Sequence, residues 1–202
     1  MSMKGKRMEH TWDKLLRIKT SGRDASGSDQ YHYPYEPTPY SVLERLCASG
    51  LISKGDVLLD YGCGKGRVDF FLSYHTKATT IGIEYDERIY QSALENKKSA
   101  VSGARTSFVK SPAEEYEVPA NVNRYYFFNP FSVELLRKVI ARIIDSDYEK
   151  PREAYLFFYY LSEEYISYLM TKDELQFYDE IDCRDLFEGN DSRERILIFS
   201  IF

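Results

Sequence analysis

The chain has 202 residues, of which 43% are hydrophobic and 29% are charged, and its formal net charge at pH 7 is −5. This length fits one domain with one large core. No apolar run approaches the roughly 20 residues that cross a bilayer, and residues 1–23 lack the apolar stretch of a secretory signal. We therefore expect a soluble, cytoplasmic protein that binds no membrane and has no broadly basic surface for coating nucleic acid.

The cysteines and histidines indicate neither a disulfide framework nor a metal site. Cys47, Cys63 and Cys183 are odd in number and far apart, and they lack the paired spacing of a zinc site. The three histidines show no spacing typical of metal binding or of a catalytic triad. We expect three free thiols and no bound metal.

Residues 1–30 combine charge with Ser, Gly and Asp, a composition that does not bury enough apolar surface to fold alone. We predict a flexible basic arm here and a single domain over residues 31–202. The arm's basic side chains either face solvent or contact phosphate. They are Lys4, Lys6, Arg7, Lys14, Arg17 and Lys19. Residues 31–40 are aromatic and proline-rich, which favours an extended segment, and a helix capped by Ser41 should follow and end at Gly50.

From Asp56 onward, apolar strands alternate with helices, as in parallel β-α-β units. The expected strands are 57–60, 79–84, 106–109, 124–129 and 154–160, and the expected helices between them include 68–74, 87–102 and 133–144. Two further strand-like runs, 174–183 and 193–202, flank the turn-prone residues 188–191 and predict an antiparallel hairpin. The predicted fold class is therefore α/β: a doubly wound, seven-stranded, mostly parallel sheet with a C-terminal antiparallel hairpin.

A glycine-rich loop, Asp60-Tyr61-Gly62-Cys63-Gly64-Lys65-Gly66, follows the first predicted strand. Glycines let a cofactor lie against bare backbone at a helix N-terminus. A dinucleotide fingerprint needs its third glycine where Arg67 stands, and no Gly-Lys-Ser/Thr follows at P-loop spacing. The spacing disfavours NAD and FAD and excludes a P-loop, while a glycine turn without a ligand remains the alternative.

Glu84 ends the second predicted strand, 20 residues after Gly64. A carboxylate at this strand end can accept hydrogen bonds from two ribose hydroxyls of a cofactor lying on the glycine loop. The alternative is an ordinary surface carboxylate.

The segment Asp60–Gly66 resembles the acid-x-Gly-x-Gly-x-Gly motif of class I, seven-stranded methyltransferases that use S-adenosylmethionine (SAM), and Ile81–Glu84 resembles their second motif. The resemblance covers about residues 38–202, and it implies that the cofactor is SAM. The residues that it assigns to SAM are Thr38, Asp60, Gly62, Cys63, Gly64, Gly66, Glu84, Tyr85, Ala113, Glu114 and Asn129. The family usually has an acid or amide after the third strand to bind adenine, whereas this chain has Ser111-Pro112-Ala113-Glu114.

The segment Phe127-Phe128-Asn129-Pro130-Phe131, at the end of the fourth predicted strand, resembles the Asn/Asp-Pro-Pro-Tyr/Phe motif of amino-methyltransferases. The resemblance implies that carbonyl oxygens of Asn129 and Pro130 accept hydrogen bonds from the target amine while Phe131 stacks on it. One proline is missing and Phe131 comes a residue early, which puts the stacking in question. Capping the next helix and holding SAM are the alternatives for Asn129.

The segment Pro34–Tyr40 resembles the Tyr-x-Pro-Thr-Pro entry segment of small lysine methyltransferases. The resemblance implies that Thr38 lies over the cofactor and that a tyrosine helps to form a narrow channel, which would suit a lysine ammonium because ring faces attract cations. Residues 155–168 could add aromatic side chains to this lining. An aromatic and proline-rich wrap over the sheet is the alternative.

These observations predict an enzyme that transfers a methyl group from SAM to a nitrogen, with a protein lysine favoured over an RNA or DNA base. The acidic net charge and the Pro37-Thr38-Pro39 segment favour the lysine, and the basic arm and the Asn129 motif favour the nucleic acid. A small-molecule acceptor and a non-catalytic SAM-binding module remain open. The acceptor and the oligomeric state do not follow from the sequence.

Overall fold

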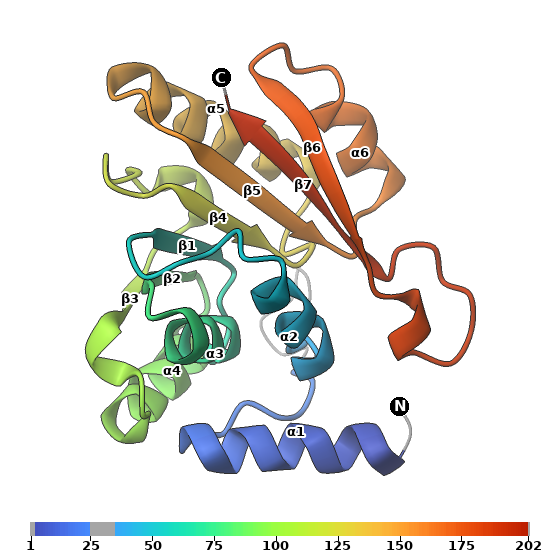
Figure 1. Cartoon of the computed structure of the whole chain (residues 1–202). Coiled ribbons are helices and arrows are strands. Elements are labelled where there is room, and N and C mark those ends of the chain that lie inside the picture. Colours follow the sequence, from blue (N-terminus) through green and yellow to red (C-terminus); the bar gives the residue numbers. More distant parts are fainter. Residues whose placement is uncertain (1–2, 25–34, 202) are drawn as a thin grey trace.

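The structure, a computed structural model, describes residues 3–24 and 35–201 (Figure 1). Its centre is a seven-stranded sheet with the strand order β3-β2-β1-β4-β5-β7-β6. The strands are β1 (Val57–Tyr61), β2 (Thr79–Glu84), β3 (Thr106–Lys110), β4 (Arg124–Phe127), β5 (Ala154–Tyr159), β6 (Leu175–Asp182) and β7 (Arg195–Ile201). Strands β1 to β5 are parallel, and β7 pairs antiparallel with both β5 and β6. The predicted C-terminal hairpin is confirmed.

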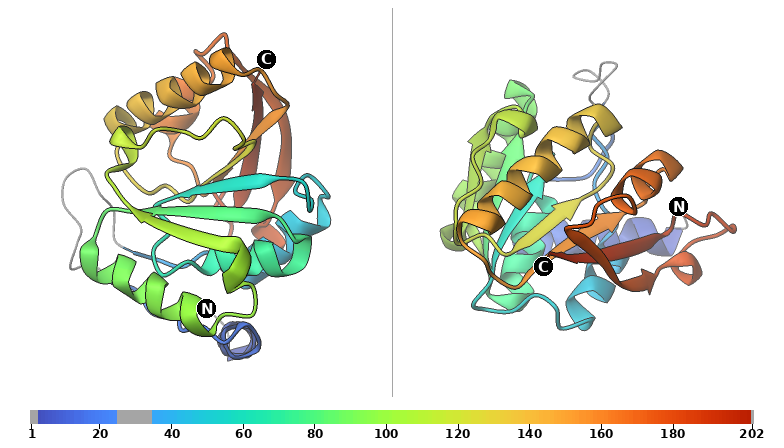
Figure 2. Two further views of the ribbon diagram at one scale, coloured as in Figure 1. Left: turned by 90° about the vertical axis from the view of Figure 1, so that its left-hand side faces the viewer. Right: turned by 90° about the horizontal axis from the view of Figure 1, so that it is seen from above.

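Helices cover both faces of the sheet (Figure 2). The helices are α1 (Met3–Leu16), α2 (Tyr40–Ala48), α3 (Arg67–Thr76), α4 (Glu87–Ser99), α5 (Val133–Glu149) and α6 (Glu163–Leu169), with short 3-10 turns η1 (Gly103–Arg105), η2 (Ala113–Glu115) and η3 (Arg184–Leu186). Helices α5 and α6 pack on one face, where they meet Leu59 of β1, whereas α1, α2 and α3 pack on the other, with Leu58. Successive residues of a strand point to opposite faces, so a continuous apolar strand serves two cores.

The sheet reverses its order beside β1, which pairs with β2 on one side and β4 on the other. In the strand register, Asp60 is paired with Gly82 of β2 on one side and with Tyr126 of β4 on the other. In open α/β sheets, ligands bind outside the carboxyl ends of the strands where the order reverses. The glycine loop lies at this point.

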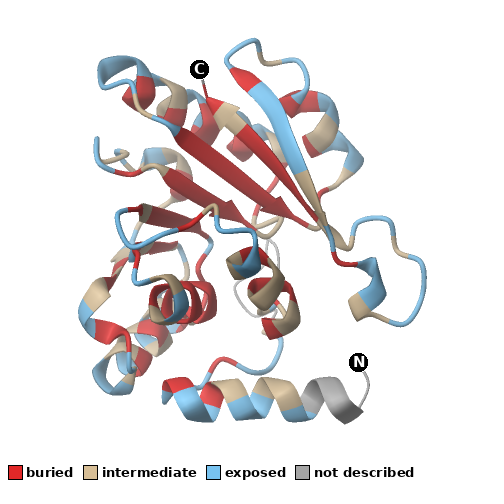
Figure 3. Ribbon diagram, in the orientation of Figure 1, coloured by how far each residue is buried: buried red, intermediate tan, exposed pale blue. Residues whose placement is uncertain are grey.

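The inner strands are buried and the edge strand β6 is largely exposed (Figure 3). Within the described residues, none of the helices combines the length and apolarity that a bilayer crossing requires.

The N-terminal segment differs from the flexible arm expected over residues 1–30. Over its described part, 3–24, it begins with helix α1 and continues as a chain that packs against α3 and α4. Leu16 is fully buried, and Trp12 packs edge-on against Phe71 with ring centroids 4.9 Å apart. Residues 25–30 and the expected boundary at 30/31 lie outside the described residues, so that boundary stays a prediction.

Several element ends also differ from the predictions. Helix α2 begins at Tyr40 with Pro39 as its N-cap, so Ser41 lies inside the helix and does not cap it. Strand β4 ends at Phe127 because the chain turns at Asn129, which has φ +40°. Helix α5 continues past its expected end at Ile144 to Glu149, and its buried face continues there with Ser146 and Asp147.

Candidate functional site

The glycine loop between β1 and α3 requires its glycines for two reasons. Gly62, Gly64 and Gly66 have φ of +74°, +56° and +84°, a region that L side chains rarely adopt. A Cβ on Gly62 would lie 2.6 Å from Cβ of Pro130, and one on Gly64 would overlap the ring of Tyr35. The loop therefore presents bare backbone to the segments that lie over it.

Backbone hydrogen bonds hold the loop against β2. The amides of Gly62 and Cys63 donate to the Ile83 carbonyl at 3.0 and 2.9 Å. The Gly64 amide donates to Glu84 Oε2 at 3.0 Å, and the Asp86 amide donates to Glu84 Oε1 at 2.8 Å. Burial raises the pKa of Glu84, and these amides oppose the rise. Glu84 therefore joins the loop to the N-terminus of α4.

Asp60 and Asp69 form a buried carboxyl pair beneath the loop, with 2% and 0% of each residue exposed. Burial raises the pKa of Asp60 to about 7 and that of Asp69 well above its usual value, and the two groups act on each other's ionisation. Two buried neighbouring carboxylates repel each other, so one of them keeps a proton. We assign that proton to Asp69, because the Asp60 charge raises its pKa further, and this leaves Asp60 as the partner that ionises near neutral pH.

Three buried acceptor oxygens near the carboxyl ends of the strands lack a hydrogen-bond partner within the described part of the chain. They are Asp60 Oδ2 near the end of β1, Glu114 Oε2 after β3 and Asn129 Oδ1 after β4. An unpartnered buried acceptor is costly, and it is expected where a ligand donor completes the site.

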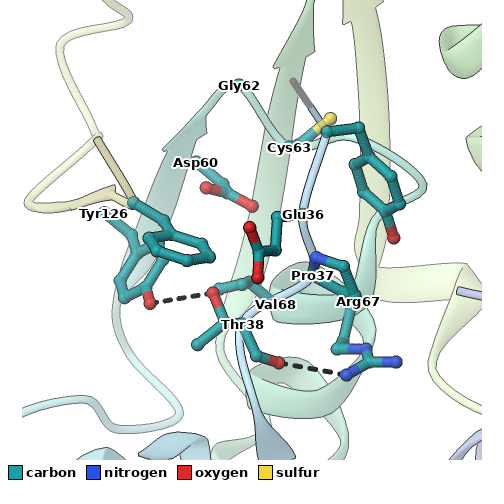
Figure 4. Close-up of a pocket in the computed structure, with 11 residues that line it drawn as sticks. Glu36, Pro37, Thr38, Asp60, Gly62, Cys63, Arg67, Val68 and Tyr126 are labelled. Carbon is teal, nitrogen blue, oxygen red and sulfur yellow. Dashed lines mark hydrogen bonds between the residues drawn. The ribbon is translucent and has the colours of Figure 1, made fainter. Parts of the chain in front are cut away.

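A small cavity of about 20 Å³ lies beside the loop (Figure 4). Its lining residues are Tyr35, Glu36, Pro37, Thr38, Asp60, Gly62, Cys63, Arg67, Val68, Tyr126 and Phe128. The Thr38 and Tyr126 hydroxyls are hydrogen-bonded at 3.1 Å, and Arg67 Nη1 donates to the Thr38 carbonyl at 3.1 Å. This volume accommodates about one water molecule.

The predicted SAM residues fall into two groups. Thr38, Asp60, Gly62 and Cys63 share the cavity. The others lie outside the cavity lining. Gly64 and Glu84 are hydrogen-bonded to each other, and Gly66 packs against Phe108. The remaining four are Tyr85, Ala113, Glu114 and Asn129. Tyr85 is 47% exposed and Ala113 is buried in η2.

The expected stacking role of Phe131 does not fit its position. Its ring is 2% exposed and lies in the core against Phe127, and its carbonyl accepts a hydrogen bond from the Tyr165 hydroxyl at 2.5 Å. Phe128, which the sequence analysis did not single out, lines the cavity instead. Pro130 lies over Gly62, so this part of the motif packs on the glycine loop.

A polar network joins α1 to the residue that follows the glycine loop. The Arg67 guanidinium, 2% exposed, pairs with Glu9, lies 3.8 Å from Asp13 and donates to the Thr20 hydroxyl at 2.7 Å. Asp13 accepts from the Tyr40 hydroxyl at 2.5 Å. The sequence did not predict this network, although Met8, Trp12, Leu15 and Leu16 have helical spacing.

Tyr35 covers part of the glycine loop. Its ring lies on Gly64, and its hydroxyl donates to the Thr20 carbonyl at 2.5 Å. Its backbone forms a two-bond antiparallel bridge with Asp24, at 3.0 and 2.8 Å. The Lys65 ammonium lies 4.8 Å from the ring centroid. The segment 35–38 is therefore fixed to the N-terminal segment as well as to the loop.

All three cysteines are free thiols. Among residues 3–24 and 35–201, no group of three or more His, Cys, Asp or Glu side chains is arranged to hold a metal ion.

Comparison with solved structures identifies the architecture. An RNA methyltransferase from Salinibacter ruber, in complex with S-adenosyl-L-homocysteine, matches with a TM-score of 0.64 over 82% of this chain and 94% of that one, at 18% identity. The glycopeptide N-methyltransferase MtfA, complexed with SAM, matches with a TM-score of 0.62 over 79% and 86%, at 9% identity. The chain has the class I methyltransferase fold. The predicted fold class is confirmed.

Sequence comparison adds one relative to this fold assignment. No family model matches the chain. A protein-lysine N-methyltransferase from Saccharolobus islandicus is 34% identical over 90 residues, which are 43% of this chain and 55% of the relative. The chain thus spans about half the length of this curated relative.

Proposed function

We propose that the chain is an enzyme that moves the methyl group of SAM to the side-chain nitrogen of a protein lysine. The observation that carries the proposal is the ionisable Asp60 carboxylate, which has an unpartnered oxygen beside the glycine loop, at the point where the sheet reverses its order. The methyltransferase fold, and the structural neighbours that are complexed with SAM and with S-adenosyl-L-homocysteine, support SAM as the ligand.

The groups at the site suit the donors of SAM. Its α-ammonium and adenine amine are hydrogen-bond donors, and the unpartnered atoms of Asp60, Glu114 and Asn129 are all acceptors. Glu84, at the end of β2, is the candidate for the ribose hydroxyls. When bound, SAM supplies a methyl group on a positively charged sulfur. The cavity of about 20 Å³ is smaller than this ligand, and Glu84, Glu114 and Asn129 lie outside its lining, so SAM would extend beyond it.

The lysine acceptor rests on two observations. The relative from Saccharolobus islandicus is named a protein-lysine N-methyltransferase. The net charge of −5 suits a basic protein as partner, because opposite charges favour encounter. The chain's own residues would orient the amine and exclude water from it, so that transfer depends on alignment and desolvation.

A nucleic-acid base is the second candidate acceptor, and the surface of the N-terminal segment favours it. Arg7, Lys14, Arg17 and Lys19 are all exposed there. Exposed cations can contact phosphates, and such binding weakens as salt concentration rises.

Calorimetric titration of the full chain with S-adenosylhomocysteine, with NADH as the comparison ligand, tests the cofactor. We expect binding in about the micromolar range to the first ligand alone. Asp60→Asn should lose this binding, whereas Asp173→Asn, which changes an exposed aspartate of the α6–β6 turn, should keep it. Equal affinities for the two variants would refute the assignment of Asp60.

The acceptor is then tested with radiolabelled SAM, using poly-L-lysine and bulk transfer RNA in parallel. Label in poly-L-lysine supports the proposal. Label in RNA alone, lost as salt is raised, supports the second candidate.

A further inference from the structure

Three aromatic rings continue from the cavity along the carboxyl ends of β4 and β5. The Phe128 ring lies 4.8 Å from that of Tyr159 and 6.3 Å from that of Tyr160, almost perpendicular to the second. Phe128 also lines the cavity with Thr38 and Asp60. The three rings are therefore in contact with one another and, through Phe128, with the candidate cofactor site.

Two acidic side chains accept hydrogen bonds from the tyrosines of this group. Asp191 lies in the loop before β7, and Glu194 immediately precedes that strand. Tyr159 donates its hydroxyl hydrogen to Glu194 Oε2 at 2.5 Å, and Tyr160 donates to Asp191 Oδ2 at 2.7 Å. Strand β7 runs antiparallel to β5, so its first residues lie at the carboxyl end of β5. We call Phe128, Tyr159, Tyr160, Asp191 and Glu194 the aromatic-acid cluster.

The two carboxylates of the cluster differ in their partners. Asp191 pairs with the Arg193 guanidinium at 2.8 Å, and that guanidinium also lies 4.3 Å from the Tyr160 ring centroid. Glu194 forms no ion pair with any other described residue, and the Tyr159 hydroxyl is neutral. The cluster thus already holds one cation on a ring face and has a second carboxylate without a cationic partner.

The backbone at Tyr160 adds a second sign of a functional site. Tyr160 has φ +59°, which is rare for an aromatic residue, and its amide donates to the Arg195 carbonyl at 3.2 Å. Such strain persists where the surrounding structure holds a side chain in a needed direction.

We propose that the aromatic-acid cluster is the methyl-acceptor site, and that Glu194 binds the ammonium of a substrate lysine beside the rings of Phe128 and Tyr160 and takes its proton. This inference rests on the proposed lysine methyltransferase function and assigns its acceptor residues. A nucleobase amine is already neutral and needs no carboxylate to remove a proton before it reacts. A lysine ammonium must lose a proton before its nitrogen can react.

One N–H bond of the ammonium breaks, and its proton passes to a carboxylate oxygen of Glu194. The nitrogen lone pair then forms the new N–C bond to the methyl carbon as the S–C bond breaks, and the sulfur keeps that electron pair. The product is a methylammonium, and the proton on Glu194 leaves to solvent.

The surroundings of Glu194 suit a base. Burial raises its pKa, and the nearby charges of Asp191 and Glu36 raise it further, against the Tyr159 hydrogen bond and Arg193, which lower it. A carboxylate whose pKa approaches the working pH is a better proton acceptor. Glu36, which lines the cavity, thus lies near enough to Glu194 to influence it electrostatically.

The test compares Glu194→Gln with Glu188→Gln in the full chain. Glu188 is an exposed glutamate of the loop before β7, six residues away. We expect Glu194→Gln to bind S-adenosylhomocysteine within twofold of wild type but to methylate poly-L-lysine about 100-fold more slowly in kcat. Glu188→Gln should match wild type in both.

The pH profile separates proton transfer from a structural role. In wild type, kcat should rise with pH as Glu194 ionises, and Glu194→Gln should lose that rise and follow only the lysine's own ionisation. Thermal melts check that Glu194→Gln folds. If it does not fold, Phe128→Leu tests the acceptor site instead. It should raise KM for poly-L-lysine about fivefold through loss of a ring face.

The failures of the two proposals can be told apart. Wild type that does not bind S-adenosylhomocysteine fails the proposed function. Wild type that methylates poly-L-lysine while folded Glu194→Gln keeps its kcat within twofold overturns only the inference. Wild type that binds the ligand yet methylates RNA alone, or neither probe, also overturns the inference.

Discussion

Gly64→Ala perturbs the contact between the glycine loop and Tyr35, and its cost follows from the structure. Gly64 has φ +56°, and a left-handed backbone costs a non-glycine residue about 1 kcal/mol. The new Cβ would also overlap the Tyr35 ring and displace it. That displacement removes the hydrogen bond to the Thr20 carbonyl, worth about 1 kcal/mol, and about 1 kcal/mol of ring burial.

The total expected loss is about 3 kcal/mol, which for a chain of this size lowers Tm by about 6–12 °C. Gly50→Ala is the matched control. Gly50 has φ +73°, but nothing lies within 4 Å of a Cβ placed there, so only the backbone term of about 1 kcal/mol applies. Urea denaturation followed by circular dichroism measures both variants.

A double-mutant cycle isolates the contact. In a Tyr35→Ala background, Gly64→Ala should cost about as little as Gly50→Ala, because the overlapping ring is gone. A Gly64→Ala cost that equals that of Gly50→Ala in wild type, or that is unchanged by Tyr35→Ala, would refute the packing of Tyr35 on the loop.

Three further outcomes follow from the buried charges. Burial raises the pKa of Asp60 to about 7, and only its ionised form holds an ammonium. The affinity for S-adenosylhomocysteine, measured by calorimetry, should therefore fall about tenfold per pH unit below about pH 7 and level off above it. An affinity that does not change with pH would contradict this. The raised pKa of Asp69 means that its contribution to stability is present below its unfolded pKa of about 4 and is lost as pH rises. Asp69→Asn should therefore increase the free energy of unfolding by about 1–3 kcal/mol at pH 8 with no gain at pH 4, as urea titrations at both pH values would show. Arg67→Ala leaves Glu9 and Asp13 without their cation and should cost about 3–5 kcal/mol, with faster amide exchange in α1; a cost below about 1 kcal/mol would mean that water screens the network.

The central strands were predictable because their apolar residues are buried. Thr79–Glu84 was predicted to the residue, and β2 lies inside the sheet between β1 and β3. The hairpin followed from turn residues, among which Gly189 has φ +106°. In both cases a local pattern agrees with the tertiary environment.

Helix α1 was not predicted, because charged residues outnumber its four spaced apolar side chains. Its buried ion pair with Arg67 links residues 58 apart in the sequence, and no local pattern reports such a contact. Composition therefore indicated a disordered segment where a distant partner provides the packing.

The candidate site was predictable only in its backbone. The spacing identified Asp60 and the glycines, but Asp69 was missed because its pairing depends on how the first turn of α3 lies against β1. The turn at Asn129 likewise sends Phe131 into the core, with Phe128 toward the cavity. Motif spacing alone does not fix which ring faces which side.

The docking of α1 has a consequence for how the chain matures during synthesis. Helix α1 leaves the ribosome before its partner Arg67, and before Asn96, whose amide oxygen accepts from the Lys19 amide at 2.8 Å. The helix must wait for the β1–α4 region to emerge before it can dock. The helix is therefore made before its partners and docks only after them, and until then its apolar face with Trp12 is exposed to solvent and to chaperones.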